Sequence, residues 1–315
     1  MESLPPIPPP IPAPIPPPNS PSNSPVNPPL VLPPILSPIP TLSVETAIRL
    51  AYWRRALCLV LLVAYPLLLS VASQLLEEIG FKAAKGATLL PEDLAGLLLS
   101  GGENLLVFGL WFLLAAWIGG LRPRHLKLVP RPRPSSILWG LGWSIGLRMV
   151  IAIIAVAGIA IWMAIHGIKD LDAEFLKGIR PKVENLVAPE SLRSPWYLFT
   201  NLTFISFVLA GFREELWRSG MIAAGIRLLP TSWRGRKGRV VFVVISSAVF
   251  GLAHLPQGWG GVVLTGILGL GLGTILLVHR SIWVAVLAHG FFDATTFLAL
   301  WVLDHFGKLA EVLKG

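Results

Sequence analysis

Apolar residues are concentrated in seven stretches separated by shorter polar segments, and this pattern predicts a chain that crosses a lipid bilayer several times. A helix needs about 20 apolar residues to cross the hydrocarbon core, because each residue adds about 1.5 Å along the axis. The fourth stretch is unusually long and would supply an eighth span if it broke in two. The stretches are residues 56–76, 104–121, 137–165, 196–229, 240–255, 260–278 and 282–303.

The composition agrees with a membrane protein. Hydrophobic residues make up 54% of the chain and charged residues only 14%, whereas soluble globular domains carry about 25% charged residues. We therefore expect an all-α fold, a polytopic transmembrane helix bundle of seven or eight spans in the lipid bilayer. Within it we separate N-terminal helices and loops (46–194) from a core (195–303) and a short C-terminal tail (304–315).

A proline-rich segment precedes the bundle. More than half of the 29 prolines lie in the first 40 residues. Proline lacks the amide proton and fixes φ, so residues 1–45 are expected to form a separate, disordered or extended cytoplasmic tail. Such a tail could bind a partner domain that recognises proline-rich motifs.

The net charge of +9 comes from basic residues that cluster between the apolar stretches. These clusters lie before the first stretch and after the second, fourth and sixth, whereas the other loops are short or mixed in sign. Cytoplasmic loops of membrane proteins are enriched in Lys and Arg, which places the N-terminus in the cytoplasm and the C-terminus outside. The same distribution argues against nucleic acid as a partner.

Ionisable side chains inside the predicted spans need a partner or a function, because each costs about 2.5 to 3.5 kcal/mol on insertion scales. If the cytoplasmic helix ends lie near residues 230, 240 and 281, the polar groups of three spans reach depths between ~12 and ~24 Å, which one pocket can accommodate. Arg148 in the third stretch could line that pocket or extend toward the interface. The other groups are Glu214, Glu215 and Arg218 in the fourth stretch, His254 in the fifth, and His289 and Asp293 in the seventh.

Helical spacing relates these side chains to one another. Residues four apart share a helix face, which puts His289 beside Asp293 and the Phe250 ring beside His254. Successive residues differ by about 100°, so only one of the two adjacent glutamates can face a pocket. The other would pair with an arginine.

Two chemistries suit a carboxylate and two imidazoles in a wet pocket inside lipid. The carboxylate can act as general base on water, with the imidazoles and a second carboxyl stabilising the oxyanion. Alternatively, Glu214, His254, His289 and Asp293 could bind zinc and leave one position open for water. Both lead to hydrolysis of an acyl bond, and neither requires a Ser or Cys nucleophile.

Three segments, "EELWRSG", "SSAVFGLAHL" and "LAHGFFDAT", resemble the motifs of the CPBP family of intramembrane proteases, which includes type II CAAX prenyl proteases and bacteriocin self-immunity proteins. The family pattern is Glu-Glu followed by Arg, then Phe-x-x-x-His, then His-x-x-x-Asn or Asp. The resemblance covers roughly residues 195–300. It implies Glu214 as the base that activates water, assisted by His254, with His289 and Asp293 as oxyanion-stabilising or ligand groups.

One position departs from the family pattern. The family usually places Arg five residues after the first Glu, where this chain has Ser219, and Arg218 stands one residue earlier. The resemblance implies that Glu215 and Arg218 are structural, but the displaced arginine leaves the roles of the two glutamates interchangeable. We therefore keep both glutamates as catalytic candidates, with Arg218 and Phe250 as supporting residues.

These observations lead to a hydrolase: an intramembrane endopeptidase, or metalloprotease if zinc takes part, that cleaves a membrane-associated protein or peptide. We expect it in the bacterial cytoplasmic membrane. The alternative is a proton-coupled transporter, because buried Glu, His and Asp also mark proton relays, although the two halves of the chain show no self-similarity. A catalytically silent membrane scaffold or immunity protein is the third interpretation.

Overall fold

The computed structural model describes residues 44–78, 90–129, 131–167, 180–182 and 186–307. The expectations for the proline-rich tail, including a partner that binds it, concern residues that lie almost entirely outside the described ranges. The same holds for most of the expected C-terminal tail.

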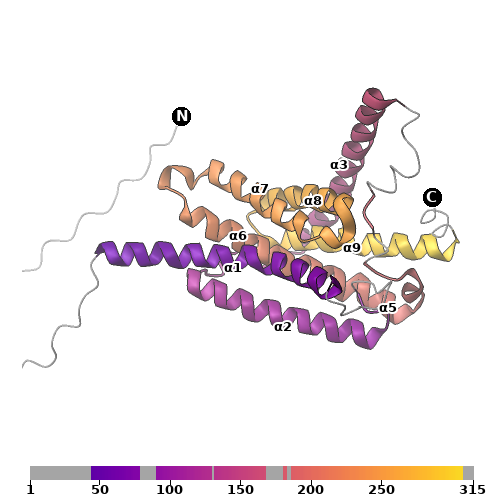
Figure 1. The fold of residues 1–315 in the computed structure, drawn as a ribbon, viewed down its shortest axis with the longest axis horizontal. Helices are drawn as coiled ribbons and strands as arrows, with labels where there is room; N and C mark the ends of the chain where they lie inside the picture. The colour runs from indigo at the N-terminus through magenta and orange to yellow at the C-terminus, as the bar shows by residue number, and fades with distance from the viewer. Residues whose placement is uncertain (1–43, 79–89, 130, 168–179, 183–185, 308–315) are drawn as a thin grey trace, which may run out of the picture. The chain divides into compact units, whose positions relative to one another are not determined.

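The described chain is all-helical (Figure 1), as the apolar pattern predicts. Six helical segments in the described residues are long and apolar enough to cross a membrane, and α7, with 17 residues, matches the remaining apolar stretch. The expected polytopic helix bundle is therefore confirmed. The α- and π-helical elements are α1 (Val44–Glu78), α2 (Leu94–Gly119), α3 (Ser135–His166), α5 (Pro195–Thr200), η4 (Asn201–Glu214), α6 (Glu215–Leu228), α7 (Arg236–Leu252), α8 (Gly258–His279) and α9 (Ile282–His305). Three short 3₁₀ turns connect them: η3 (Pro189–Arg193), η5 (Thr231–Trp233) and η6 (Leu255–Gln257).

The second span begins earlier than the apolar pattern suggests. The Asp93 side chain caps α2 by accepting a hydrogen bond from the Gly96 amide at 2.8 Å, and Gly120 ends the helix in the left-handed conformation with φ 61°. The charged Glu103 interrupts the apolar run, so the run in the sequence begins at residue 104. In the structure Asn104 lies inside α2 rather than at its start.

The fourth apolar stretch forms one continuous helical segment from Pro195 to Leu228 rather than two spans. Its central part, η4, is a π-helix of 14 residues, in which backbone hydrogen bonds run between residues five apart. The buried Ser206 hydroxyl donates to the Asn201 carbonyl at 2.6 Å, and the Asn201 amide donates to the Tyr197 carbonyl at 2.9 Å. The Ser206 hydroxyl and the side-chain NH2 group of Asn201 are thus paired inside the segment, whereas the buried Oδ1 atom of Asn201 has no hydrogen-bond partner among the described residues.

The interface between η4 and α9 depends on close backbone approach. A Cβ atom at Gly211 of η4 would lie 2.8 Å from the carbonyl oxygen of Val286 in α9. On the opposite side of the interface, Gly290 of α9 leaves space that the Phe207 ring of η4 fills. Both glycines therefore let the two segments pack closely enough to bring their polar residues together.

Helix ends and one loop gather at the basic end of the bundle, a name we use for the ends of α2, α6 and α8, the starts of α7 and α9, and loop 121–129. Arg227 of α6 donates to the Gly119 carbonyl at the end of α2 at 3.0 Å. The backbone amide of Ile282 donates to the Lys127 carbonyl at 3.1 Å. The first bond ties α6 to α2, and the second ties the loop to α9.

The close approach at Gly211 leads to a stability prediction. Gly211→Ala should lower the free energy of unfolding by about 1 to 3 kcal/mol, because the new Cβ meets a backbone oxygen that cannot rotate away. The measurement is thermal unfolding of the purified protein in detergent.

Gly109→Ala in α2 is the matched control, because a Cβ there meets no atom within 4 Å. It should unfold at the wild-type temperature or slightly above, since alanine favours helix. Equal unfolding temperatures for the two variants would show that the η4–α9 contact is less tight than described.

Candidate active site

A cavity of about 480 Å³ lies between η4, α6, α7, α8 and α9, with α1 and α2 completing its wall. The part of its lining that comes from α2, η4, α8 and α9 is mainly apolar. Several sequence-predicted residues line the cavity together, whereas Glu215 and Arg218 lie behind the wall with no exposed surface. The predicted residues that line it are Glu214, Phe250, His254, His289 and Asp293.

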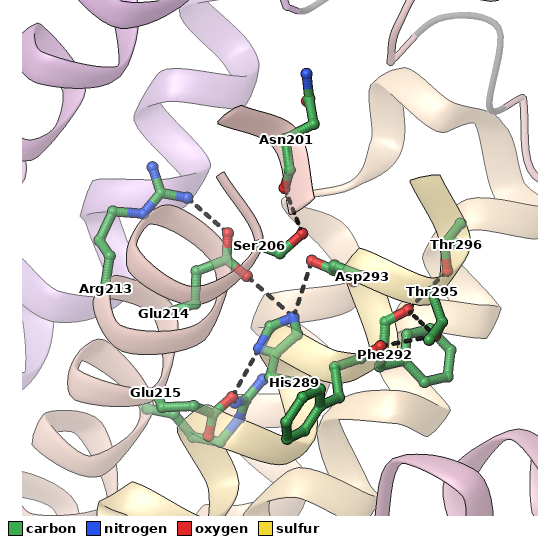
Figure 2. Close-up of polar contacts among 12 residues, drawn as sticks. Asn201, Ser206, Arg213, Glu214, Glu215, His289, Phe292, Asp293, Thr295 and Thr296 are labelled. Atoms are coloured by element: carbon green, nitrogen blue, oxygen red, sulfur yellow. Dashed lines mark hydrogen bonds and ion pairs between the residues drawn. The ribbon is translucent and has the colours of Figure 1, made fainter. Parts of the chain in front are cut away.

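His289 of α9 lies at the centre of the polar cluster (Figure 2). Its Nδ1 atom is 3.1 Å from Oε1 of Glu215, a hydrogen-bond distance. Its Nε2 atom is 3.8 Å from Oε2 of Glu214 and 3.7 Å from Oδ2 of Asp293. A carboxylate oxygen accepts, so Nδ1 can donate to Glu215, whereas the two contacts of Nε2 are longer than a hydrogen bond.

Glu215 and Arg218 form a buried ion pair beneath the cavity. Both side chains are 0% exposed, and the Arg218 guanidinium donates to Oε1 of Glu215. The guanidinium also lies over the Phe250 ring, 4.5 Å from its centroid, in cation–π geometry. Glu215 is therefore shared between Arg218 and His289, which fixes the orientation of the imidazole.

Glu214 faces the cavity from the junction of η4 and α6. Arg213 donates from Nη2 to Oε1 of Glu214 at 2.6 Å and from Nη1 to the Asn104 side-chain oxygen. The amide of Asn104 thus connects α2 to the carboxylate through Arg213. Sequence reasoning missed Asn104, although a polar side chain inside an apolar helix was the available signal.

His254 lies just beyond the end of α7 rather than inside a span. The helix ends at Leu252, and His254 precedes the short turn η6. Its Nδ1 atom is 2.8 Å from the Phe250 carbonyl oxygen. Because a carbonyl only accepts, Nδ1 carries the proton, and the neutral ring has its lone pair on Nε2.

Arg148 binds α9 next to Asp293, so it neither lines the cavity nor extends toward the interface. Its guanidinium donates to the Phe292 carbonyl oxygen and to the hydroxyls of Thr295, at 2.5 Å, and Thr296, at 3.0 Å. It also lies 4.2 Å from the centroid of the Phe292 ring. Arg148 therefore connects α3 to the turn of α9 that carries the cavity carboxylate.

Residues 195–295 match the type II CAAX prenyl endopeptidase Rce1-like family. The matched segment begins with α5 and ends in α9, so it contains both glutamates, both histidines and Asp293. No curated protein and no solved structure matches the chain. The resemblance drawn from the three motifs is confirmed over this segment, and it supports protease activity in an integral membrane protein.

The fit of a zinc ion to this CAAX-endopeptidase-like segment can be judged from its donor atoms. Glu214, His254, His289 and Asp293 share one cavity, but in the described part of the chain no three His, Cys, Asp or Glu side chains are arranged to hold a metal ion. Both ring nitrogens of His289 face carboxylate oxygens, and a nitrogen that donates a proton to such an oxygen has no lone pair for a metal. We derive no step through a metal.

Removal of Arg218 should destabilise the protein strongly. Arg218→Ala leaves the Glu215 carboxylate buried and short of one cationic partner, so we expect a loss of about 3 to 5 kcal/mol in the free energy of unfolding. Thermal or denaturant unfolding in detergent measures the loss.

The exposed ion pair between Arg49 and Glu45 offers a control within the same chain. Arg49→Ala should cost no more than about 1 kcal/mol, because the two side chains are 74% and 83% exposed. A similar loss for both variants would contradict the importance assigned to the buried pair.

Proposed function

We propose that the chain is an intramembrane endopeptidase that hydrolyses a peptide bond in a membrane-associated protein or peptide. The observation that carries this proposal is the shared cavity, which places Glu214, His254, His289 and Asp293 from three helical segments around one space. The family match over residues 195–295 supports the same reaction class.

Glu214 is the general base in this proposal. Arg213 engages its Oε1 atom, whereas Oε2 lies on the side of His289, at a distance of 3.8 Å that is too long for a hydrogen bond. This oxygen can accept a proton from a water molecule in the cavity. The Nε2 lone pair of His254, which lines the same cavity, can accept a hydrogen bond from that water and orient it.

His289 supplies the oxyanion stabilisation. The water oxygen bonds to the carbonyl carbon of the substrate, and negative charge develops on the carbonyl oxygen. The Nε2–H group of His289 is positioned by Glu215 on the other side of the ring and can donate to that oxygen. Asp293, 3.7 Å from Nε2, stabilises the positive charge of the imidazole.

Transfer of the proton from Glu214 to the leaving amine completes the reaction. When the tetrahedral intermediate collapses, the carbon–nitrogen bond breaks and Glu214 returns the proton to the leaving amine. The products are a carboxylate and an amine, and the carboxylate of Glu214 is regenerated. No covalent intermediate with the protein forms.

The cavity lining indicates the kind of segment that would bind. Leu97, Ile205, Leu209 and Phe297 face the cavity together with the polar cluster, so apolar side chains near the scissile bond would bury surface there. Part of the lining comes from connections between the long helices, with Pro181 and Leu186 before η3 and Pro256 and Gln257 in η6. We place substrate entry at that part.

Activity tests compare the proposed catalytic base with a carboxylate that lies outside the cavity. Glu214→Gln should reduce the rate of peptide cleavage about a hundredfold or more, because the amide cannot accept the proton. The measurement is cleavage of a membrane peptide library by full-length protein in vesicles. Glu103→Gln, an exposed position on α2 outside the cavity, should leave the rate unchanged.

The same assay distinguishes the alternatives. Equal rates for wild type and Glu214→Gln would rule out this mechanism, and uphill solute uptake abolished by the substitution would favour a transporter. A chelator should leave cleavage unchanged. Loss of activity that added zinc restores would show that a metal takes part.

We also propose that the protein resides in the bacterial cytoplasmic membrane with its basic end toward the cytoplasm. Lys and Arg residues gather at that end, as in cytoplasmic loops. With seven crossings, including α7, the N-terminus lies in the cytoplasm and the C-terminus outside.

Reporter fusions test this orientation. Alkaline phosphatase, which is active only outside the cytoplasm, should be active when fused after residue 307 and inactive when fused in the α6–α7 turn. The opposite pattern would reverse the orientation, and the same result at both positions, active or inactive, would show that α7 does not cross the membrane.

A further inference from the structure

A second cavity, of about 470 Å³, lies at the basic end of the bundle. Loop 121–129, α6, the start of α7 and the turn between α8 and α9 enclose it. Ser219 of α6 lines this cavity and donates to the Leu126 carbonyl at 2.8 Å, which holds the loop in place. Ser219 is also the position at which the chain departs from the family pattern.

The charged side chains that line this cavity are all cationic. Those of Arg227 and Arg234 donate to backbone carbonyls, whereas the side chains of the four other cations make no hydrogen bond or ion pair with another described residue. No carboxylate is among the lining residues. The six cations of the lining are Arg124, Lys127, Arg227, Arg234, Arg239 and Arg280.

The pKa of His125, in loop 121–129, also reflects the excess of positive charge around the cavity. Burial lowers the pKa of the imidazole, and the positive charges of the surrounding Arg and Lys side chains lower it further. Like charges that converge without an acidic partner repel one another, so an anion in the cavity would relieve the repulsion.

The backbone at the cavity is also unusual. Among the described residues, Lys127 and Arg280 are the two non-glycine residues with positive φ, 58° and 52°, and both line this cavity. Strained backbone of this kind is concentrated at functional sites. The hydrogen bond from the Ile282 amide to the Lys127 carbonyl fixes the two strained segments side by side.

The remaining wall is apolar and comes from two membrane-spanning helices. Ile222, Ala223 and Ile226 of α6 face Leu276 and Leu277 of α8 across the cavity. A free phosphate ion would bind the cations and leave this apolar wall unused. A phospholipid would use both, because its phosphate is anionic and its acyl chain is apolar.

We propose that this cavity binds an anionic phospholipid, with the headgroup phosphate among Arg124, Lys127, Arg239 and Arg280 and an acyl chain along α6 and α8. The site is separate from the catalytic cavity, and its occupancy does not depend on the proposed protease activity. The ligand contacts α6, the helix whose other end carries Glu215.

The test compares two double variants that remove the same charge from the same end of the bundle. Arg239→Gln/Arg280→Gln changes two cavity cations, and Arg131→Gln/Arg133→Gln changes two exposed arginines outside the cavity. Delipidated full-length protein in detergent is titrated with phosphatidylglycerol at constant ionic strength, with thermal unfolding and native mass spectrometry as readouts.

We expect phosphatidylglycerol to stabilise the wild type and the control variant at similar concentrations. The cavity variant should need about thirtyfold more lipid, because two phosphate contacts are lost. Phosphatidylcholine and inorganic phosphate should give little stabilisation. If the double variant does not fold, Arg124→Gln in the exposed loop replaces it, with a loss of about fivefold.

Three results would overturn the proposal. Equal lipid dependence in the cavity and control variants would show that only general surface charge matters. Equal stabilisation by phosphatidylcholine would remove the role of the cations. Stabilisation by inorganic phosphate that matches the lipid and is lost in the cavity variant would assign the site to a free anion.

Discussion

A carboxylate buried within a membrane protein must be neutralised by its own chain, and the structure is organised around one such group. Glu215 has no exposed surface, and its Oε1 atom accepts hydrogen bonds from both Arg218 and His289. The bond from His289 joins α9 to α6 and holds the His289 ring in one orientation. The adjacent Glu214 is therefore free to face the cavity, and the two glutamates have different roles because they point in different directions.

The backbone beneath this cluster explains how the groups come so close. η4 is π-helical, and its hydrogen-bond pattern changes which side chains share a face compared with an α-helix. The close contact at Gly211 allows η4 to lie directly against the backbone of α9. Functional sites often contain short π-helical distortions, and here the distortion ends at Glu214.

The segment from residue 215 to residue 228 connects the two cavities of the molecule. At its start, Glu215 supports the polar cluster around His289, and along its length Ser219 and Arg227 contact the loop and helix end that enclose the basic cavity. The two glutamates of the first cluster are paired with Arg213 and Arg218, whereas no carboxylate lines the basic cavity. Polar groups within a bilayer must find their partners inside the protein, because lipid offers none.

The sequence by itself determined the helical class, the approximate spans and the set of buried ionisable residues, since hydropathy and helical spacing depend only on neighbouring positions. The motifs also identified the family-like segment. Helical spacing predicted that one glutamate faces a pocket while the other pairs with an arginine, whereas in the structure both glutamates pair with one, Glu214 with Arg213 and Glu215 with Arg218. Only the tertiary structure placed His254 beyond the end of its helix, linked Asn104 to Glu214 through Arg213, and assigned Arg148 to α9. These features depend on contacts between helices that are distant in the sequence, and no local pattern specifies which polar group a neighbouring helix will present.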